Sequence, residues 1–250
     1  MRIVIRPTHL TRVLVTVVCC LVLAHVTVEV LRMGFGVERF AKLLRLVDLG
    51  SEANLPTWYS SAALLLASAL LTVIAHHKRR TGAPYERHWA VLALIFLGLS
   101  IDEAAQIHEM TIKQLRALVG GRGLLYFTWV IPGAAFTITT ALAYMRFLKD
   151  LPPGTRSGFL AGGAMFVGGA LGAEMIGGYL LETYGRHSIA YAVVKTVEET
   201  LEMLGIVVFI HALTSYIADD IGAVHVQLGA AGRGARPVRA DRLSESVPAE

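Results

Sequence analysis

The sequence predicts an all-α fold, a polytopic membrane helix bundle with about six transmembrane helices. Hydrophobic residues make up 54% of the 250 residues and charged residues only 17%, whereas a soluble domain has about 45–50% apolar and about 25% charged residues. Several apolar runs approach the ~20 residues that a helix needs to cross a membrane. Most Lys and Arg lie between these runs, as topology signals do, while nearly half of the acids lie inside the runs or at their ends. We therefore expect a six-helix transmembrane domain over residues 1–221 and no nucleic-acid partner.

The first predicted span, residues 13–33, follows a basic N-terminal segment. This start is similar to a signal peptide, but the apolar run is nearly long enough to span a membrane and no small-x-small cleavage site stands out. We therefore expect an uncleaved helix. His25 and Glu29 lie four residues apart in it, so they share one face. The adjacent Cys19 and Cys20 match no zinc spacing, and we expect them to pack or to face lipid.

The second and third spans are predicted over residues 56–75 and 89–109. Residues 35–49, which precede them, interleave basic and apolar side chains and predict an amphipathic segment on the membrane surface. The third span ends in the run IDEAAQIHE, residues 101–109. This run holds four ionisable side chains that are costly to bury in lipid, namely Asp102, Glu103, His108 and Glu109.

The fourth span, residues 124–148, contains Pro132, which predicts a kink that neighbouring helices must compensate. The fifth span, residues 158–181, is rich in glycine. Its Gly168 and Gly172 form a small-xxx-small pair, which predicts that another helix approaches closely at this face.

The sixth span, residues 189–217, carries four ionisable side chains within an arc of about 100°, namely Lys195, Glu198, Glu199 and Glu202. His211 points about the other way and lies deeper. Residues 222–250 consist mainly of Gly, Ala, Arg, Ser and Pro, a composition that predicts a disordered C-terminal tail.

The bias of Lys and Arg predicts a multi-pass protein of the cell (inner) membrane with both termini in the cytoplasm. With this topology, ionisable groups of the first, third, fifth and sixth spans fall at one depth, in the outer half of the membrane. With the inverted topology they would still share one depth. The polar faces are expected to point into the bundle, because lipid is the more costly environment.

Acids greatly outnumber cations in this layer, so some carboxyl groups must hold protons or a metal ion must supply positive charge. Carboxylates combined with imidazoles suit Mn, Fe or Zn better than Mg or Ca. The Glu-x-x-His pattern of di-iron helix bundles is absent, so the likeness to such bundles is one of ligand types only. The predicted ligands of a divalent metal are His25, Glu29, His108, Glu109, Glu174, Glu199 and Glu202. The predicted supporting or proton-transfer groups are Asp102, Glu103, Lys195 and Glu198.

Three functions remain open from the residues. The first is a membrane protein that binds a divalent metal and acts as a metal-dependent enzyme on a membrane lipid or a small substrate. The second is a transporter or channel in which the same acids relay protons or cations. The third is a structural membrane protein, in which Glu109 and Glu182 lie among the headgroups and Lys195 forms a structural ion pair with Glu199 or Glu202.

The runs LPTWYSS, IDEAAQIHE and VEETLEMLG resemble an uncharacterised group of bacterial multi-pass membrane proteins that share a DEAxxIHE-type run. The resemblance covers most of residues 1–220. It implies about six spans and no particular activity. The Ala, Gly and Arg content of the tail also fits a bacterial source.

Overall fold

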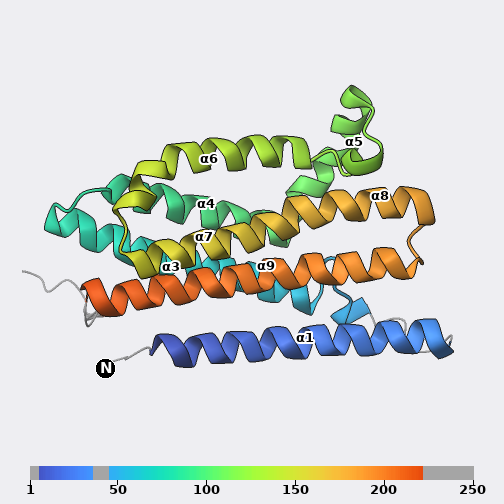
Figure 1. The fold of residues 1–250 in the computed structure, drawn as a ribbon, viewed down its shortest axis with the longest axis horizontal. Helices are drawn as coiled ribbons and strands as arrows, with labels where there is room; N and C mark the ends of the chain where they lie inside the picture. The colour runs from blue at the N-terminus through green and yellow to red at the C-terminus, as the bar shows by residue number, and fades with distance from the viewer. Residues whose placement is uncertain (1–5, 36–44, 222–250) are drawn as a thin grey trace, which may run out of the picture.

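The protein is a bundle of long helices, shown in Figure 1 for a computed structural model that describes residues 6–35 and 45–221. Six helical segments in this part of the chain are long and apolar enough to cross a membrane, and no strand occurs in it. The predicted all-α membrane bundle is therefore confirmed. The expected disordered tail and most of the expected amphipathic segment at 35–49 lie outside the described residues.

The described elements are all helical and follow one another along the chain. They are α1 (Pro7–Phe35), α3 (Leu55–Thr81), α4 (Glu86–Ala105), α5 (Ile107–Val119), the short η2 (Gly123–Leu125), α6 (Val130–Asp150), α7 (Pro153–Val167), the π-helical η3 (Gly168–Ala173), α8 (Glu174–Tyr184), α9 (Ile189–Tyr216) and the π-helical η4 (Ile217–Ile221). The segments α7, η3 and α8 together form one span, and α9 with η4 forms another.

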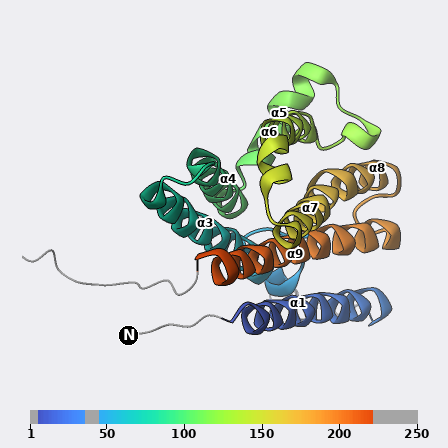
Figure 2. The same cartoon turned by 60° about the vertical axis from the view of Figure 1, so that its left-hand side comes forward.

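Helix α9 lies at the centre of the bundle, between α1 on one side and α7 and α8 on the other (Figures 1 and 2). Its side chains supply much of the core, with Met203, Ile210 and Leu213 fully buried. At the end where α9 finishes, aromatic rings pack together. Trp89 of α4 lies 5.0 Å from both the Phe147 ring of α6 and the Tyr216 ring of α9, between ring centroids. We call this the aromatic end of the bundle.

The prediction of one helix over residues 89–109 is wrong at its C-terminal end, because the chain changes direction at Gln106. Helix α4 ends at Ala105, Gln106 takes a left-handed conformation with φ +56°, and α5 starts at Ile107. The carboxylate of Asp102 accepts the backbone N–H of His108 at 2.8 Å. This side-chain hydrogen bond gives the backbone an alternative to the helical bond. Figure 1 shows that α5 runs across the bundle axis instead of along it.

Pro132 does not kink the fourth span. Helix α6 begins only at Val130, so Pro132 lies in the first turn, where a backbone N–H has no partner within the helix. The residues before Val130, predicted to be helical, form η2 and a turn.

Helices α7 and α9 approach each other closely at glycines other than the predicted Gly168 and Gly172. A Cβ atom on Gly205 of α9 would lie 2.7 Å from the backbone nitrogen of Phe166 and 2.8 Å from the carbonyl oxygen of Gly162, both in α7. Gly168 and Gly172 are exposed, and a Cβ atom there would meet nothing within 4 Å. The prediction for Gly168 and Gly172 is therefore wrong, because the rotation of α7 and η3 about their axis points those glycines away from α9.

We expect Gly205→Leu to destabilise the bundle by about 1–3 kcal/mol or more, because the side chain would press on the backbone of α7. The melting temperature of the detergent-purified protein measures this. Gly172→Leu is the matched control and should melt like the parent. Equal melting temperatures for the two variants would contradict the assigned helix contact.

Candidate functional site

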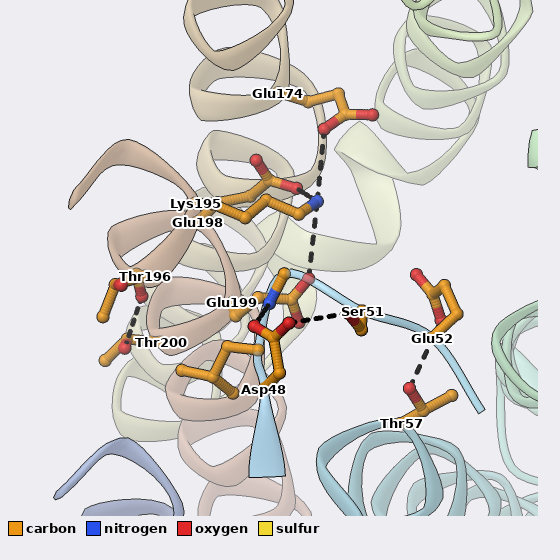
Figure 3. A network of polar contacts seen from close by, with 12 residues as sticks. Asp48, Ser51, Glu52, Thr57, Glu174, Lys195, Thr196, Glu198, Glu199 and Thr200 are labelled. Carbon is orange, nitrogen blue, oxygen red and sulfur yellow. Dashed lines mark hydrogen bonds and ion pairs between the residues drawn. The ribbon is translucent and has the colours of Figure 1, made fainter. Parts of the chain in front are cut away.

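A buried lysine joins three carboxylates at the end of the bundle opposite the aromatic end. The Lys195 ammonium of α9 lies 2.5 Å from Glu198 Oε1, 3.5 Å from Glu174 Oε2 and 3.5 Å from Glu199 Oε1. Figure 3 shows Lys195 between Glu174 and Glu199, with Glu198 beside it. The Lys195 side chain is only 18% exposed and that of Glu198 only 4%. The pairing of Lys195 with Glu199, one of the readings left open by the sequence, is present.

The network combines two helices that approach each other closely. Lys195, Glu198 and Glu199 lie on one face of α9, because side chains three and four residues apart are neighbours on a helix. Glu174 begins α8, directly after the π-helical η3, and π-helical segments often occur at functional sites. A Cβ atom on Gly169 of η3 would lie 2.7 Å from the Glu198 carbonyl oxygen, so only glycine permits this contact.

One further hydrogen bond and one unpaired oxygen characterise the carboxylates of the network. The indole N–H of Trp129 donates to Glu174 Oε1 at 3.1 Å. The second oxygen of Glu198, Oε2, is buried and has no hydrogen-bond partner among the described residues. A buried acceptor without a donor costs free energy, so this oxygen is available to a proton or a cation.

His108, at the start of α5, is oriented by Asp102 of α4. Asp102 Oδ2 lies 2.8 Å from His108 Nδ1, and Asp102 Oδ1 accepts the His108 backbone N–H at 2.8 Å. When Nδ1–H donates to a carboxylate, Nε2 carries the free electron pair. Metal-binding histidines are commonly held by a carboxylate in this way.

Glu52 joins His108 and Glu109 in a group that the sequence did not predict. One ligand atom from each of the three residues lies within 4.8 Å of the other two. Glu52 comes from the loop before α3, and its carboxylate accepts the Thr57 hydroxyl at 3.3 Å. A single acid in a connecting loop gives little signal in a sequence that is searched for polar faces of helices, so Glu52 was missed. Trp129 was missed because a tryptophan inside a predicted apolar span gives no sign of a hydrogen bond to a carboxylate.

The loop that carries Glu52 is fixed by its own polar side chains. Asn54 accepts the backbone N–H of Thr57 at 3.1 Å, which caps α3. Its amide also donates to the carbonyl oxygens of Asp48 at 2.6 Å and Ser51 at 2.7 Å. The Asp48 carboxylate accepts the Ser51 hydroxyl at 2.7 Å. Glu52 is thereby held at one place beside α5.

Burial and nearby charges shift the pKa values of two groups in this cluster. Burial raises the pKa of Glu52, and the positive charge of Lys195 only partly opposes it. Burial acts to lower the pKa of His108, but the hydrogen bond and the charge of Asp102 outweigh it, so the pKa of His108 is raised. Both groups therefore hold protons to a higher pH than in water.

Two cavities meet at these residues. An inner cavity of about 550 Å³ lies between α4, α6, α7 and α9, and it is lined by all the predicted site residues except His25 and Glu29. An outer cavity of about 910 Å³ lies toward α5 and the turn between α8 and α9. Four ionisable residues line both cavities, namely Glu52, Glu109, Glu174 and Lys195. We call these four the junction residues.

The predicted layer of ionisable groups is thus brought together around one cavity, although not around one centre. Glu103, Glu199 and Glu202 line the inner cavity with His108 and Glu109. Among the described residues, however, the compact ligand group pairs His108 and Glu109 with Glu52. Glu182 lines neither cavity and is exposed, and it accepts the backbone N–H of Gly123 at 2.5 Å.

His25 and Glu29 form a separate group with Asp48, in which one ligand atom from each lies within 4.8 Å of the others. Both ring nitrogens of His25 are already engaged. Nδ1 accepts the backbone N–H of Leu49 at 3.0 Å, and Nε2 lies 3.0 Å from the Thr196 hydroxyl. His25 therefore connects α1, the Glu52 loop and α9, and this geometry favours a structural role.

Comparison with known proteins identifies one family whose model matches this chain. The family model described as "Domain of unknown function (DUF8692)" matches residues 12–217. No curated protein and no solved structure matches the chain.

We expect the metal-free protein to lose stability as the pH rises through the pKa of His108. Because the folded state raises this pKa above its ordinary value, protonated His108 stabilises the fold. The stabilisation is present below about pH 6.5 and is lost as the pH rises through the folded-state pKa. In EDTA, the melting temperature of His108→Gln should therefore fall less between about pH 6 and 8 than that of the parent.

The matched control for this measurement is His187→Gln, because His187 is exposed in the turn between α8 and α9. It should keep the pH dependence of the parent. Identical pH dependence in the parent and in His108→Gln would show that His108 is not held in its protonated form by Asp102.

Proposed function

We propose a function for this chain, which belongs to the DUF8692 family, from the geometry of its membrane-embedded site. The protein is a multi-pass membrane protein that binds a divalent metal ion through Glu52, His108 and Glu109. It acts as a metal-dependent enzyme on a membrane lipid held in the adjoining inner cavity. The observation that carries the proposal is the approach of these three ligand atoms to within 4.8 Å of one another at the junction of the two cavities.

The donor set fits a first-row metal. One imidazole and two carboxylates suit Mn, Fe or Zn better than Mg or Ca. Ligand atoms about 2.0–2.2 Å from an ion lie at most about 4.4 Å apart, so small side-chain rotations would bring the three residues from 4.8 Å to binding distance. Of the predicted ligands, this proposal keeps His108 and Glu109 and adds Glu52.

Asp102 would hold the His108 ring and keep Nε2 free for the metal, as carboxylates do behind metal-bound histidines. The ion itself would supply a Lewis acid and an activated water. Lys195 supplies the nearby positive charge. Glu174, Glu198, Glu199 and Glu202 line the same cavity as the proposed ligands. The free Glu198 Oε2 makes that side chain the best placed of them to accept or hold a proton.

A transporter is less well supported, because the acids do not continue through the bundle. Beyond Glu103 and Glu202, the inner cavity is lined toward the aromatic end by residues such as Phe96, Phe159 and Phe209. Among the described residues, no carboxylate, histidine, lysine or arginine lines this part of the cavity. A relay of protons or cations needs such groups across the whole membrane.

We expect the protein, purified without a histidine tag, to contain a metal ion that elemental analysis detects. His108→Ala and Glu52→Gln should lose it, because each removes a ligand. Asp102→Asn should lower the affinity for added Mn²⁺ or Zn²⁺ by about 10–100-fold, since supporting residues typically have this effect.

Two exposed residues near the same end of the bundle give the controls. His187→Ala and Glu182→Gln should bind metal like the parent, because neither residue lines a cavity. Unchanged metal content in His108→Ala would refute the site. A metal-free parent with infrared bands of protonated carboxyl groups near neutral pH would instead indicate that the acids hold protons.

We also propose that both termini are cytoplasmic in the cell (inner) membrane, from the bias of Lys and Arg. Reporter fusions that end at Gly82 or Ile221 should then give a cytoplasmic signal, and one that ends at Gly121 an external signal. A cytoplasmic signal at Gly121 would reverse the orientation of the bundle and place the site near the inner face of the membrane.

A further inference from the structure

We propose that the ligand of this site is an amphiphile with a phosphate-bearing headgroup in the outer cavity and a hydrocarbon tail in the inner cavity. The inference rests on the proposed function for the choice of site and names the class of substrate. It does not require a bound metal, so it can be tested in metal-free protein.

The inner cavity has the lining and the length that a hydrocarbon tail needs. Apart from the ionisable groups at one end, its walls are mainly apolar side chains of α4, α6, α7 and α9. The lining residues of α6 run from Gly133 to Leu148, a helix length of about 22 Å. Its volume of about 550 Å³ lies within the range of about 300–1,000 Å³ typical of ligand pockets.

The packing of α6 leaves this cavity beside the lipid. The buried residues of α6 are Val130 at its start and Tyr144 and Phe147 near its end, with none between them. Figure 2 shows α6 on the opposite side of α9 from α1, at the outside of the bundle. Since α6 packs firmly only at its two ends, the middle of the helix borders both the cavity and the surrounding hydrocarbon. A lipid tail is the ligand that can enter from there.

The outer cavity has the charge that a phosphate needs. Basic side chains from four separate elements line it, namely Arg45, Lys113, Arg116, Arg186 and Lys195. The Arg116 guanidinium lies over the Tyr126 ring at 4.2 Å and donates to the Tyr126 carbonyl oxygen at 2.5 Å. Its Nε atom is buried with no hydrogen-bond partner among the described residues.

Arginine groups held in this way are suited to phosphate. The guanidinium offers several donors in a fixed plane and binds phosphate oxygens in pairs. A cationic headgroup would be repelled by Arg45, Lys113, Arg116 and Arg186. The acids among the lining residues of the outer cavity are the junction residues Glu52, Glu109 and Glu174, and Lys195 partly compensates Glu174. The headgroup therefore fits on the basic side of the junction and the tail on the apolar side.

The test compares lysophosphatidic acid with a monoacylglycerol of the same chain and with inorganic phosphate, using EDTA-treated protein in detergent and native mass spectrometry. Lysophosphatidic acid should bind at least about tenfold more tightly than either, a difference of about 1.4 kcal/mol. Equal binding of the phosphate-free lipid would overturn the headgroup assignment. Equal binding of inorganic phosphate would overturn the tail assignment.

Paired variants locate the two parts of the ligand. Gly163 lines the inner cavity and a Cβ atom there meets nothing within 4 Å, so Gly163→Leu should fill the cavity and weaken lysophosphatidic acid at least about tenfold. Gly168→Leu is the control, because Gly168 is exposed and lines neither cavity. Parent-like binding by Gly163→Leu would overturn the tail assignment.

Arg186→Gln and Lys113→Gln should each weaken lysophosphatidic acid and leave the monoacylglycerol unchanged. Arg122→Gln, at an exposed position outside both cavities, should change neither. Metal binding without lipid binding would overturn this inference and leave the proposed metal site standing. Lipid binding by a protein that binds no metal would support this inference and overturn the proposed metal site.

Discussion

This end of the bundle depends on the ion pairs between the Lys195 ammonium group and the carboxylates around it. Three carboxylates from α8 and α9 surround it at 2.5–3.5 Å, and all four side chains are largely buried. Buried charges are tolerated only when they are paired, and removal of one partner of a buried pair costs about 3–5 kcal/mol. The pair with Glu174 in turn requires the close approach of η3 to α9, which Gly169 permits. The position of α8 and the charge of the site are therefore fixed together.

The two cavities lie on either side of the junction residues, and they differ in the side chains that line them. On the side of α6 the helices contribute apolar side chains, and α6 packs firmly only at its two ends. On the other side, α5 contributes Arg116 and the turn between α8 and α9 contributes Arg186. The junction residues thus separate the apolar inner cavity from the more basic outer cavity. This pair of linings matches the two halves of an amphiphile. The aromatic end, with Trp89 against Phe147 and Tyr216, joins α4, α6 and α9 where the inner cavity finishes.

The turn at Gln106 decides which of the predicted ligand residues lie close together. In an uninterrupted helix, Asp102 and Glu109 would share a stripe, and His108 would lie to one side. The turn instead places His108 and Glu109 at the start of α5, with Asp102 paired to the imidazole Nδ1 and a carboxylate oxygen of Glu52 within 4.8 Å of a ring nitrogen. Asp102 thus has two roles that cannot be separated. It ends the third span, and it orients the histidine.

Hydropathy and charge along the sequence were sufficient to predict the six spans and the shared layer of Glu103, Lys195, Glu198 and Glu202, because a helix in lipid must satisfy its backbone internally and its length follows from composition. The helix contacts were decided only by the tertiary structure. Gly162 and Gly205 meet where Gly168 and Gly172 were expected, since the rotation of one helix against another depends on all the side chains between them. Glu52 joined the site because its loop lies beside α5, and His25 was engaged elsewhere by hydrogen bonds to Leu49 and Thr196. Both outcomes bring together residues that are far apart in the chain, which no local pattern records.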